Sequence, residues 1–548
     1  MDYAQLAQLM FPHTEHDVDY YLNKYGPRDL PEGAIVTRYA PSPTGFIHMG
    51  ALYASFVSRT FAKQTGGVFY LRIEDTDTKR TVDNGIQLII DDLKKFGVVF
   101  DEGPVSQTEA VGDYGPYIQT QRKEIYDTFV KHLVAQGKAY PCFCTPEELE
   151  AIRAQQEREK EPIIGYWGKY AKYRELDPAE AARRIESGEP YVVRLKSFGD
   201  PTRKETFRDE IKGKLTVPET CLDIVIMKGD GFPTYHFAHF VDDTLMRTTH
   251  VIRGDEWIAS LPIHLQLFRT FGFQPPKYAH IAPLMKTEDG STRKLSKRKD
   301  PECAISYYFE IGMPTESILL YLATICNSDF EDWFMKNPGA KIEDFTFRFN
   351  HIGKAGAIYD LAKLYNISKG FVSRMKAQEL YDRSAPFLKE YDPAFYELYS
   401  RDEAYSVAAL NIDREKPKPR KDIAVYGDIK AQIWYLYDEL FHTPWQDNSI
   451  IDTAILSDYF ANVYDPADDS AAWMEKVKAF APKHGYAADV KEYKKNPDQY
   501  KGHFGAICGM LRYLVTSQTN SPDLYSILHL LGGQRVLARW NAYQEWAK

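Results

Sequence analysis

The segment RYAPSPTGFIHMG, residues 38–50, combines residue types that suit the binding of a phosphate group. Its glycines would let a ligand approach the backbone, and a helix that starts here would offer N–H groups and the positive end of its dipole. The imidazole of His48 can donate a hydrogen bond to a phosphate oxygen. The same composition is also typical of a tight turn with a histidine that caps the helix. Spacing alone leaves both interpretations open.

A second candidate segment is basic. Lys294-Leu295-Ser296-Lys297-Arg298 follows the polar, glycine-containing stretch TEDGSTR. Several cations on a mobile loop suit a leaving pyrophosphate, because stabilisation accelerates a reaction most where charge develops in the transition state. The alternative is a solvated basic loop without a ligand.

The elements around the first segment predict a parallel sheet. Residues 33–40 (GAIVTRYA) form a short strand that ends in a cluster of proline and glycine. Apolar residues at helical spacing predict a helix over 48–64, and 68–73 (VFYLRI) predicts a buried strand. Strand, helix and strand with a glycine-bearing first turn open a doubly wound α/β sheet, which binds ligands beyond the carboxyl ends of its strands. We therefore expect the first site near residues 38–50.

The predicted secondary structure changes character twice farther along the chain. Helices are predicted over 84–97 and 121–136, and charged helices with short β patches from Pro141 to Gly229 indicate an inserted domain. Residues 221–237 resume a buried strand and turn, so the insertion splits the sheet. HVIRGDEW and YAHIAPLM supply two further strand ends with polar tips. After about residue 300 the pattern is mostly helical.

The composition predicts an ordinary protein of several domains. A chain of 548 residues exceeds what one hydrophobic core supports, and we expect about three to five domains. No apolar run is long enough to span a membrane, and the start MDYAQLAQLMFPH lacks the features of a secretory signal. Six cysteines, most of them scattered, indicate reduced thiols. We therefore expect a cytoplasmic protein.

Net charge and local charge point in different directions. The formal net charge of −9 gives no support to a nucleic-acid partner and by itself favours a metabolic enzyme. Basic residues nevertheless cluster at 293–299 and at 414–421. Because such runs are more often solvated faces than phosphate sites, neither cluster alone identifies a partner.

Taken together, the two candidate segments resemble the paired signature sequences of the class I aminoacyl-tRNA synthetases. RIEDTD at 72–77, GFPTYHFAHFVDDTLM and HVIRGDEW resemble more specifically the bacterial glutamyl branch, in the same order and at similar separations. The resemblance runs from about Ala34 to Lys299. Farther on, FTFRFNHIGKAGAIYDLAKLYNIS is loosely similar to a stem-contacting segment of the family.

The resemblance implies a ligase that uses ATP to convert L-glutamate to glutamyl-adenylate and transfers it to the 3'-terminal adenosine of tRNA(Glu), releasing AMP and pyrophosphate. The substrate carboxylate attacks the α-phosphorus, so catalysis is positioning plus electrostatics and needs no protein nucleophile. Mg²⁺ would accompany ATP, an inference from the substrate and not from a ligand motif. We expect tRNA(Glu), glutamate and ATP as partners, no membrane, and a monomer.

Site residues of the family can be carried over position by position. The resemblance places the amino acid against Arg38, Ala40, Ser42, Glu74, Tyr235, His239 and Arg253. It places ATP against His48, Gly50, Glu256, Trp257, Met285, Lys294, Ser296 and Lys297, of which His48, Lys294 and Lys297 are the catalytic set. The two arginines suit the two carboxylates of glutamate, and Glu74 suits its ammonium group. His239 stands where some relatives have asparagine, which bears on the contact with the side-chain carboxylate.

The resemblance also implies an order of domains. They are an N-terminal extension at 1–33, a Rossmann-type catalytic domain at 34–118 and 231–285, an inserted tRNA acceptor-binding domain at 119–230, a signature-lysine loop and stem-contact domain at 286–375, and a helical anticodon-binding region at 376–548. Most relatives lack the extension, and the sequence suggests no function for it.

Cys142 and Cys144 raise the question of a zinc site, because some relatives bind zinc in the inserted domain with such a pair and a second pair farther along. Here the corresponding stretch, GYWGKYAKYREL, offers Tyr166, Tyr170 and Tyr173 but neither cysteine nor histidine. Structural zinc usually takes four nitrogen or sulfur ligands. We therefore expect no metal ligands in the chain and a pair of reduced thiols.

Rival functions remain at this point. A glutaminyl-tRNA synthetase shares the fold, but RIEDTD and APSPTG differ from the variants usual in that branch. A tRNA-modifying paralogue lacks anticodon-binding domains, whereas a long stretch of chain follows Lys299 here. A catalytically inactive regulatory paralogue tends to lose the signature residues, which are present. The sequence does not decide whether the enzyme also charges tRNA(Gln) with glutamate.

Overall fold

The computed structural model describes residues 1–43, 45, 47–77, 82, 84–442 and 444–548. The chain divides into two compact units. Unit 1 comprises Met1–Tyr307 and Leu319–Asp360, and unit 2 comprises Tyr308–Ile318 and Leu361–Lys548. These units are coarser than the predicted domains, whose boundaries stay predictions. No helix among the described residues is long and apolar enough to cross a membrane.

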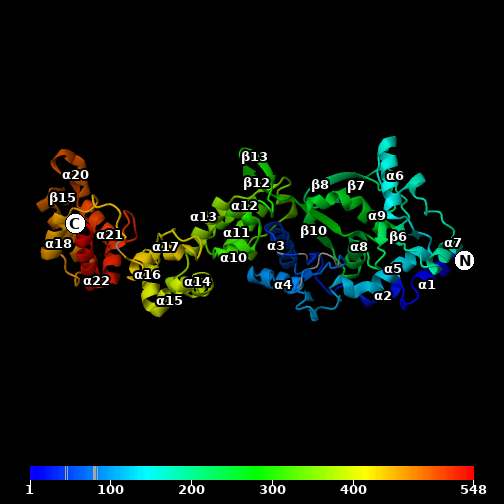
Figure 1. Cartoon of the computed structure of the whole chain (residues 1–548), viewed down its shortest axis with the longest axis horizontal. Helices are drawn as coiled ribbons and strands as arrows, with labels where there is room; N and C mark the ends of the chain where they lie inside the picture. The colour runs from blue at the N-terminus through cyan, green and yellow to red at the C-terminus, as the bar shows by residue number, and fades with distance from the viewer. Residues whose placement is uncertain (44, 46, 78–81, 83, 443) are drawn as a thin grey trace. The chain divides into compact units, whose positions relative to one another are not determined.

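The first predicted strand, helix and strand are present in unit 1. β1 (Val36–Tyr39) and β2 (Val68–Leu71) pair in parallel. They are connected by α3 (Met49–Gln64), which is labelled in Figure 1. The apolar side chains whose spacing predicted the helix, such as Leu52 and Phe56, are buried. This part of the prediction is confirmed.

A second strand, helix and strand follows later in the chain. β10 (His250–Gly254) and β11 (Lys277–Ile281) also pair in parallel, with α9 (Leu261–Phe271) between them in sequence. The backbone N–H of Thr249 donates to the carbonyl of Val36 at 2.9 Å, so β10 starts beside β1.

The segment between these pairs forms an antiparallel sheet of its own. β5 (Ala139–Cys142), β6 (Val192–Leu195) and β9 (Val225–Met227) are neighbours in that order. The buried strand predicted within 221–237 is present as β9, but it pairs with β6 and with neither parallel pair. An apolar run fits either kind of sheet, and its periodicity does not reveal the partner strand.

The rest of unit 1 mixes helices and short strands. Its remaining helices are α1 (Tyr3–Met10), α2 (Val18–Lys24), α4 (Gly85–Lys95), α5 (Lys123–Ala135), α6 (Pro146–Glu159), α7 (Pro178–Glu186), α8 (Tyr235–Leu245) and α12 (Ser328–Lys336). Its remaining strands are β3 (Gly103–Pro104), β4 (Ala110–Val111), β7 (Lys204–Asp209), β8 (Gly213–Pro218), β12 (Leu284–Glu288), β13 (Ser291–Lys294) and β14 (Ala357–Ile358). Two of the sequence boundaries between the units fall within α10 (Ser306–Glu310) and α11 (Thr315–Cys326), and the third lies between Asp360 and Leu361.

The N-terminal extension is an integral part of unit 1. Leu6 of α1 is buried in one apolar cluster with Phe129 of α5 and Ala181 of α7. Farther along the extension, Arg28 donates to both carboxylate oxygens of Glu102, at 2.6 and 2.9 Å. The extension therefore ties the inserted segment to the chain that follows β2.

Helices make up most of unit 2, as the sequence predicted for the C-terminal part. They are α13 (Leu361–Val372), α14 (Ala377–Tyr391), α15 (Pro393–Arg401), α16 (Glu403–Asn411), α17 (Asp428–Ile433), α18 (Thr453–Asn462), α19 (Ser470–Phe480), α20 (Val490–Lys495), α21 (Gly505–Thr516) and α22 (Leu524–Trp546). A short parallel pair, β15 (Tyr486–Ala487) and β16 (Gly502–His503), lies among them. One core of buried aromatic and aliphatic side chains extends from Val372 to Tyr543.

The packing of α1 gives a first prediction. Leu6→Ala removes a buried side chain that α5 and α7 enclose, so it should lower the free energy of unfolding by about 3 kcal/mol. The measurement is calorimetric unfolding beside Gln8→Ala, which changes an exposed residue of the same helix. If both variants unfold at the wild-type temperature, α1 does not stabilise the unit.

Candidate active site

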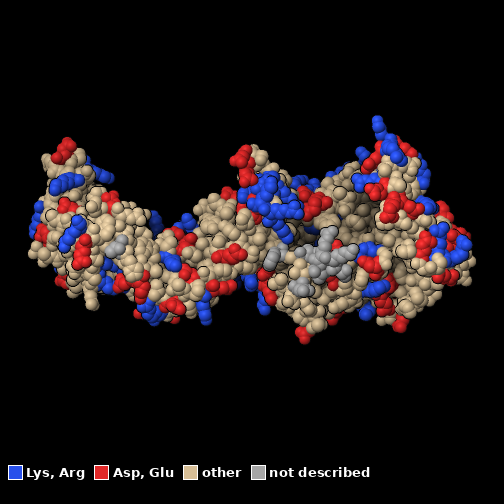
Figure 2. Space-filling model, in the orientation of Figure 1, with Lys and Arg blue, Asp and Glu red and all other residues tan. Residues whose placement is uncertain are grey.

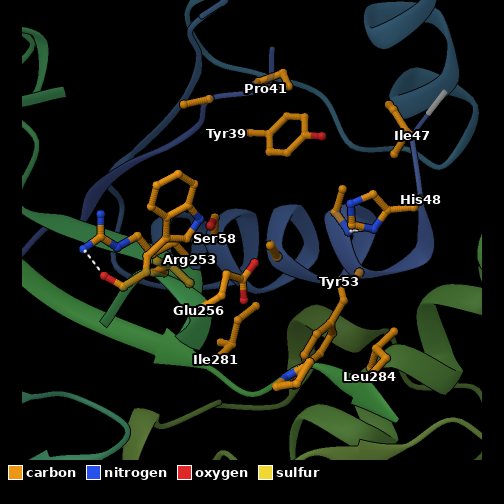
Figure 3. A pocket seen from close by; sticks show the side chains of 18 of the residues that line it. Tyr39, Pro41, Ile47, His48, Tyr53, Ser58, Arg253, Glu256, Ile281 and Leu284 are labelled. Carbon is orange, nitrogen blue, oxygen red and sulfur yellow. Dashed lines mark hydrogen bonds between the residues drawn. The ribbon is translucent and has the colours of Figure 1, made fainter. Parts of the chain in front are cut away.

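One pocket of about 640 Å³ lies where the chain leaves β1 and β10. Its wall combines the segment after β1, the start of α3, the segment after β10 and residues 281–284 at the end of β11. Figure 3 shows His48 and Arg253 on opposite sides of this pocket, with Glu256 between them. The pocket therefore lies at the carboxyl ends of parallel strands, where the sequence placed the first site.

Most of the predicted site residues line this pocket. They are Arg38, Ala40, Ser42, His48, Gly50, Glu74, Tyr235, Arg253, Glu256, Trp257, Lys294 and Lys297. Segments that lie far apart in the sequence thus contribute to one cavity. The role of each residue toward a ligand stays a prediction.

The other three predicted residues, His239, Met285 and Ser296, are outside the pocket lining. His239 of α8 is fully buried. Met285 lies on β12 opposite Lys294 of β13. Ser296 donates its backbone N–H to a carboxylate oxygen of Asp300 at 2.9 Å. The structure therefore places these residues beside or beneath the pocket.

His48 caps the N-terminus of α3. Its Nδ1 accepts a hydrogen bond from the backbone N–H of Ala51 at 3.1 Å. Burial, together with the positive charges of Lys297 and Lys294, lowers the pKa of His48 to about 4, so the ring is neutral at pH 7. A neutral ring whose Nδ1 accepts carries its proton on Nε2. The capping role and the phosphate role are compatible, because they use different ring nitrogens.

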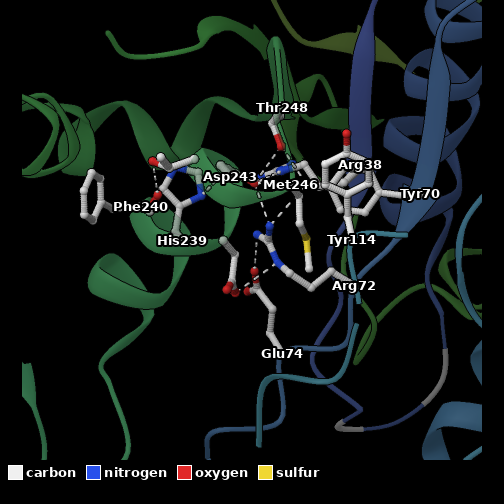
Figure 4. A network of polar contacts seen from close by, with 12 residues as sticks. Arg38, Tyr70, Arg72, Glu74, Tyr114, His239, Phe240, Asp243, Met246 and Thr248 are labelled. Carbon is white, nitrogen blue, oxygen red and sulfur yellow. Dashed lines mark hydrogen bonds and ion pairs between the residues drawn. The ribbon is translucent and has the colours of Figure 1, made fainter. Parts of the chain in front are cut away.

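A buried carboxylate, Asp243 of α8, holds two arginines (Figure 4). Its Oδ1 accepts a hydrogen bond from Nη1 of Arg72 at 2.6 Å and lies 3.4 Å from Nε of Arg38. Its Oδ2 lies 2.9 Å from Nδ1 of His239. Burial alone would raise the pKa of Asp243, but the neighbouring cations, Arg72 first, hold that pKa well below its usual range. Asp243 is therefore the ionised partner of the arginine pair.

The same network positions Glu74. Nη2 of Arg72 donates to Oε1 of Glu74 at 2.9 Å, and the Glu74 side chain is 8% exposed. Burial raises the pKa of Glu74 above its usual value, although Arg72 acts in the opposite direction. A cationic group of a ligand would stabilise the ionised form, so Glu74 suits an ammonium group.

Arg253 is a buried cation that no described carboxylate balances. Nη1 and Nη2 both lie 3.3 Å from Nδ1 of His264, and Nη2 donates to the carbonyl of Trp257 at 3.5 Å. Burial holds the pKa of His264 well below its usual range, so this histidine is neutral. Among the described residues, no carboxylate lies within ion-pair distance of the guanidinium. An anionic ligand in the pocket would supply the missing charge.

Glu256 folds back over the end of β10. A methyl group on Gly254 would lie 2.2 Å from Oε2 of Glu256, so a larger residue at this position would displace the Glu256 carboxylate. The rings of Trp257 and Tyr235 lie beside them, with centroids 4.5 Å apart. This edge of the pocket offers an acceptor for hydroxyl groups and flat apolar faces for a ring.

The basic segment follows the hairpin of β12 and β13. Asp300 fastens it through ion pairs with Arg293 at 2.6 Å and Lys286 at 3.1 Å. Lys294 and Lys297 are exposed and line the pocket. Figure 2 shows Lys and Arg side chains gathered on this part of the surface. The described geometry thus brings the two candidate segments of the sequence together at one cavity.

Sequence reasoning did not single out Arg72, Asp243 or His264. The signal for the first two was present, because each is an ionisable residue within or directly after a buried apolar element, and a buried charge needs a partner. His264 gave no such signal. Its contact with Arg253 depends on how α9 lies against β10, which local sequence does not specify.

Cys142 is the last residue of β5, Cys144 lies between β5 and α6, and both are reduced thiols. The thiol of Cys144 donates to the hydroxyl oxygen of Tyr166 at 3.6 Å, and that oxygen also accepts the N–H of Tyr173 at 3.0 Å. Within the described part of the chain, no group of three or more His, Cys, Asp or Glu could hold a metal ion. The absence of zinc stays a prediction.

The model of the family "tRNA synthetases class I (E and Q), catalytic domain" matches residues 34–348. The chain belongs to this family, as the two signature segments predicted. Its relatives include a glutamate–tRNA ligase from Clostridium perfringens (strain SM101 / Type A), 47% identical over 99% of this chain and 100% of the relative. A glutamate–tRNA ligase from Sorangium cellulosum is 42% identical over 95% of this chain and 96% of the relative.

A solved structure of a protein from the same family also matches this chain. The crystal structure of a glutamate tRNA ligase from Elizabethkingia meningosepticum, in complex with its amino acid, matches with a TM-score of 0.75 and 26% identity. The match covers 94% of this chain and 100% of that chain. The family's catalytic fold is therefore present here.

The buried histidine behind the pocket gives a second prediction. Burial lowers the pKa of His239 to about 3, so below pH 6.5 the unfolded chain binds a proton that the folded protein does not bind. Acidification from pH 7 to pH 5 should therefore cost the wild type about 2 kcal/mol more than His239→Asn, which has no group to titrate. The measurement is the free energy of unfolding of both proteins at each pH. Parallel pH profiles would show that His239 does not contribute.

Proposed function

We propose that the protein is a glutamate–tRNA ligase that activates L-glutamate with ATP and transfers it to the 3'-terminal adenosine of tRNA(Glu), releasing AMP and pyrophosphate. The observation that carries the proposal is Arg253, a buried guanidinium that faces the pocket and has no described carboxylate partner. Arg38 provides a second guanidinium, and Glu74 an acceptor for the amine. The names of the relatives at 47% and 42% identity support the same activity.

In the activation step, a carboxylate oxygen of glutamate attacks the α-phosphorus of ATP, and the bond to pyrophosphate breaks. The chain supplies orientation and charge. Arg38, Arg253 and Glu74 would fix the amino acid. His48 would donate Nε2–H to a phosphate oxygen, and Lys294 would stabilise the negative charge that develops on the leaving pyrophosphate.

In the transfer step, a hydroxyl of the terminal ribose attacks the carbonyl carbon of the mixed anhydride, and AMP leaves. Glu256 and Trp257 would hold the ribose and base of the nucleotide at the edge of the pocket. No protein side chain forms a covalent bond in either step. Rate enhancement then rests on the position of the bound groups.

Mg²⁺ bound with ATP would neutralise part of the negative charge of the phosphates. The described pocket lining carries the carboxylates of Glu74 and Glu256, and the first of these is held by Arg72. These residues do not make a metal-binding set of their own. A metal ion would therefore arrive with ATP.

We further propose the domain roles that follow from the family. The two parallel pairs would form the Rossmann-type domain, at 34–118 and 231–285, split by an acceptor-binding domain at 119–230. The lysine-bearing and stem-contact region would occupy 286–375. The helical core of unit 2 supports an anticodon-binding role for 376–548.

Specificity provides the test of the proposed function. Glutamine cannot form the charge-assisted pair and would leave a buried guanidinium unpaired, so activation should favour glutamate by about a hundredfold or more. The measurement is ATP–pyrophosphate exchange with each amino acid, with and without tRNA. Arg253→Ala should abolish most glutamate activation, and Arg253→Lys should restore only part, because lysine lacks the planar fork.

An exposed arginine of α6, Arg153, is the control for these variants, since Arg153→Ala should not change exchange. Equal activation of glutamine and glutamate by the unmodified protein would contradict the proposal and favour a glutaminyl-tRNA synthetase.

The basic segment gives a further prediction. Lys297→Ala should slow adenylate formation by about 3 kcal/mol of transition-state stabilisation or more, with little change in the KM for glutamate, because the lysine acts on developing charge. Lys299→Ala, an exposed lysine outside the pocket lining, is the matched control. A near-normal exchange rate in Lys297→Ala would remove the segment from the mechanism.

A further inference from the structure

A chain of buried contacts reaches Arg253 from the hairpin of β7 and β8. Oδ2 of Asp209, at the end of β7, lies 2.7 Å from Nδ1 of His280 on β11. Nε of Arg253 donates to Nε2 of the same histidine at 3.1 Å. Asp209, His280 and Arg253 are 1%, 0% and 6% exposed. The contact therefore links a hairpin outside the pocket lining to the arginine inside it.

The hydrogen atoms of the contacts between Asp209, His280 and Arg253 can be arranged in only one way. Nε of Arg253 always carries a proton, so Nε2 of His280 must accept, and the proton of a neutral imidazole must then be on Nδ1. That N–H faces the carboxylate of Asp209, which also accepts the backbone N–H groups of Ile211 at 2.9 Å and Lys212 at 2.8 Å. Every neighbour of Asp209 in these contacts is a donor, and a carboxylate is the side chain that only accepts.

We propose that Asp209 and His280 are positioning residues for Arg253. They fix the guanidinium through Nε, so that its Nη groups stay at the pocket for a carboxylate ligand. The inference rests on the proposed function and deepens it, since it names what holds the group that recognises the amino acid. The hairpin of β7 and β8 then belongs to the amino-acid site, although it touches no ligand.

Asp209→Asn tests the order of the hydrogen atoms. An asparagine has one acceptor and one donor. If its oxygen keeps the backbone N–H groups, its NH₂ faces Nδ1 of His280 and demands the other tautomer. Nε2–H then opposes Nε–H of Arg253. We expect the KM for glutamate in ATP–pyrophosphate exchange to rise about tenfold or more, with kcat and the KM for ATP within about twofold of wild type.

A second substitution should rescue the first. His280→Gln places an amide near Arg253 that can turn its oxygen toward Nε whatever residue 209 presents. The double variant Asp209→Asn/His280→Gln should therefore recover most of the lost affinity for glutamate. If Asp209 only stabilised the hairpin, the two losses would add.

The matched control is Glu210→Gln, the same change of carboxylate to amide at the next residue, which should leave the KM for glutamate unchanged. Should Asp209→Asn fail to fold, His280→Gln and His280→Met decide, because they are nearly equal in size and only glutamine offers Arg253 a strong acceptor. The methionine variant should then have a KM for glutamate about tenfold above the glutamine variant.

The outcomes separate the two proposals. If the wild type does not exchange pyrophosphate with glutamate, the proposed function is wrong. If the wild type does exchange, three results overturn the inference: an unchanged KM for glutamate in Asp209→Asn, additive losses in the double variant, or equal effects of glutamine and methionine at position 280.

Discussion

The ion pair between Asp243 and Arg72 is the contact on which the active site depends. Both side chains are fully buried, and their 2.6 Å hydrogen bond is surrounded by Arg38, His239 and Glu74. Taking such charges out of water costs several kcal/mol for each ion, so they persist only where every partner is in place. Loss of Asp243 would leave Arg38 and Arg72 without the carboxylate that they share. The network therefore gives the pocket a single arrangement.

This network converts distant parts of the sequence into one site. Arg38 lies on β1, Arg72 follows β2 and Asp243 lies on α8, yet their charged groups meet beneath the pocket. Packing of apolar strands alone would tolerate small shifts between these elements. Charge-assisted hydrogen bonds tolerate much less, because they weaken steeply with angle. Buried polar contacts therefore determine the geometry of the side of the pocket that Arg38 and Glu74 line.

Sequence predicted the local elements well and the long-range partners poorly. The strand and helix that flank His48 have strong local signals, namely a turn cluster of glycine and proline and apolar residues at helical spacing, and these elements are present. The pairing of β9 with β6 and the contact of Asp209 with His280 have no local signal, since they depend on how separate elements approach each other. Most site residues were placed through motifs of the family and not through periodicity. His239 shows the limit of prediction from motifs. A motif match identifies the residue at a position, but it does not tell whether the side chain is buried or lines the pocket.

The positive charges on the two sides of the pocket have different neighbours. Around Arg253 the neighbours are neutral histidines, which accept hydrogen bonds without adding negative charge, so the guanidinium keeps an unbalanced positive charge. A carboxylate of the protein in their place would neutralise the arginine and remove its attraction for an anionic ligand. Around Arg38 and Arg72, by contrast, Asp243 supplies negative charge for two cations. Arg72 also pairs with Glu74 and with Asp242, so carboxylates of the protein balance the cations on this side, and the attraction for an anionic ligand depends mainly on Arg253.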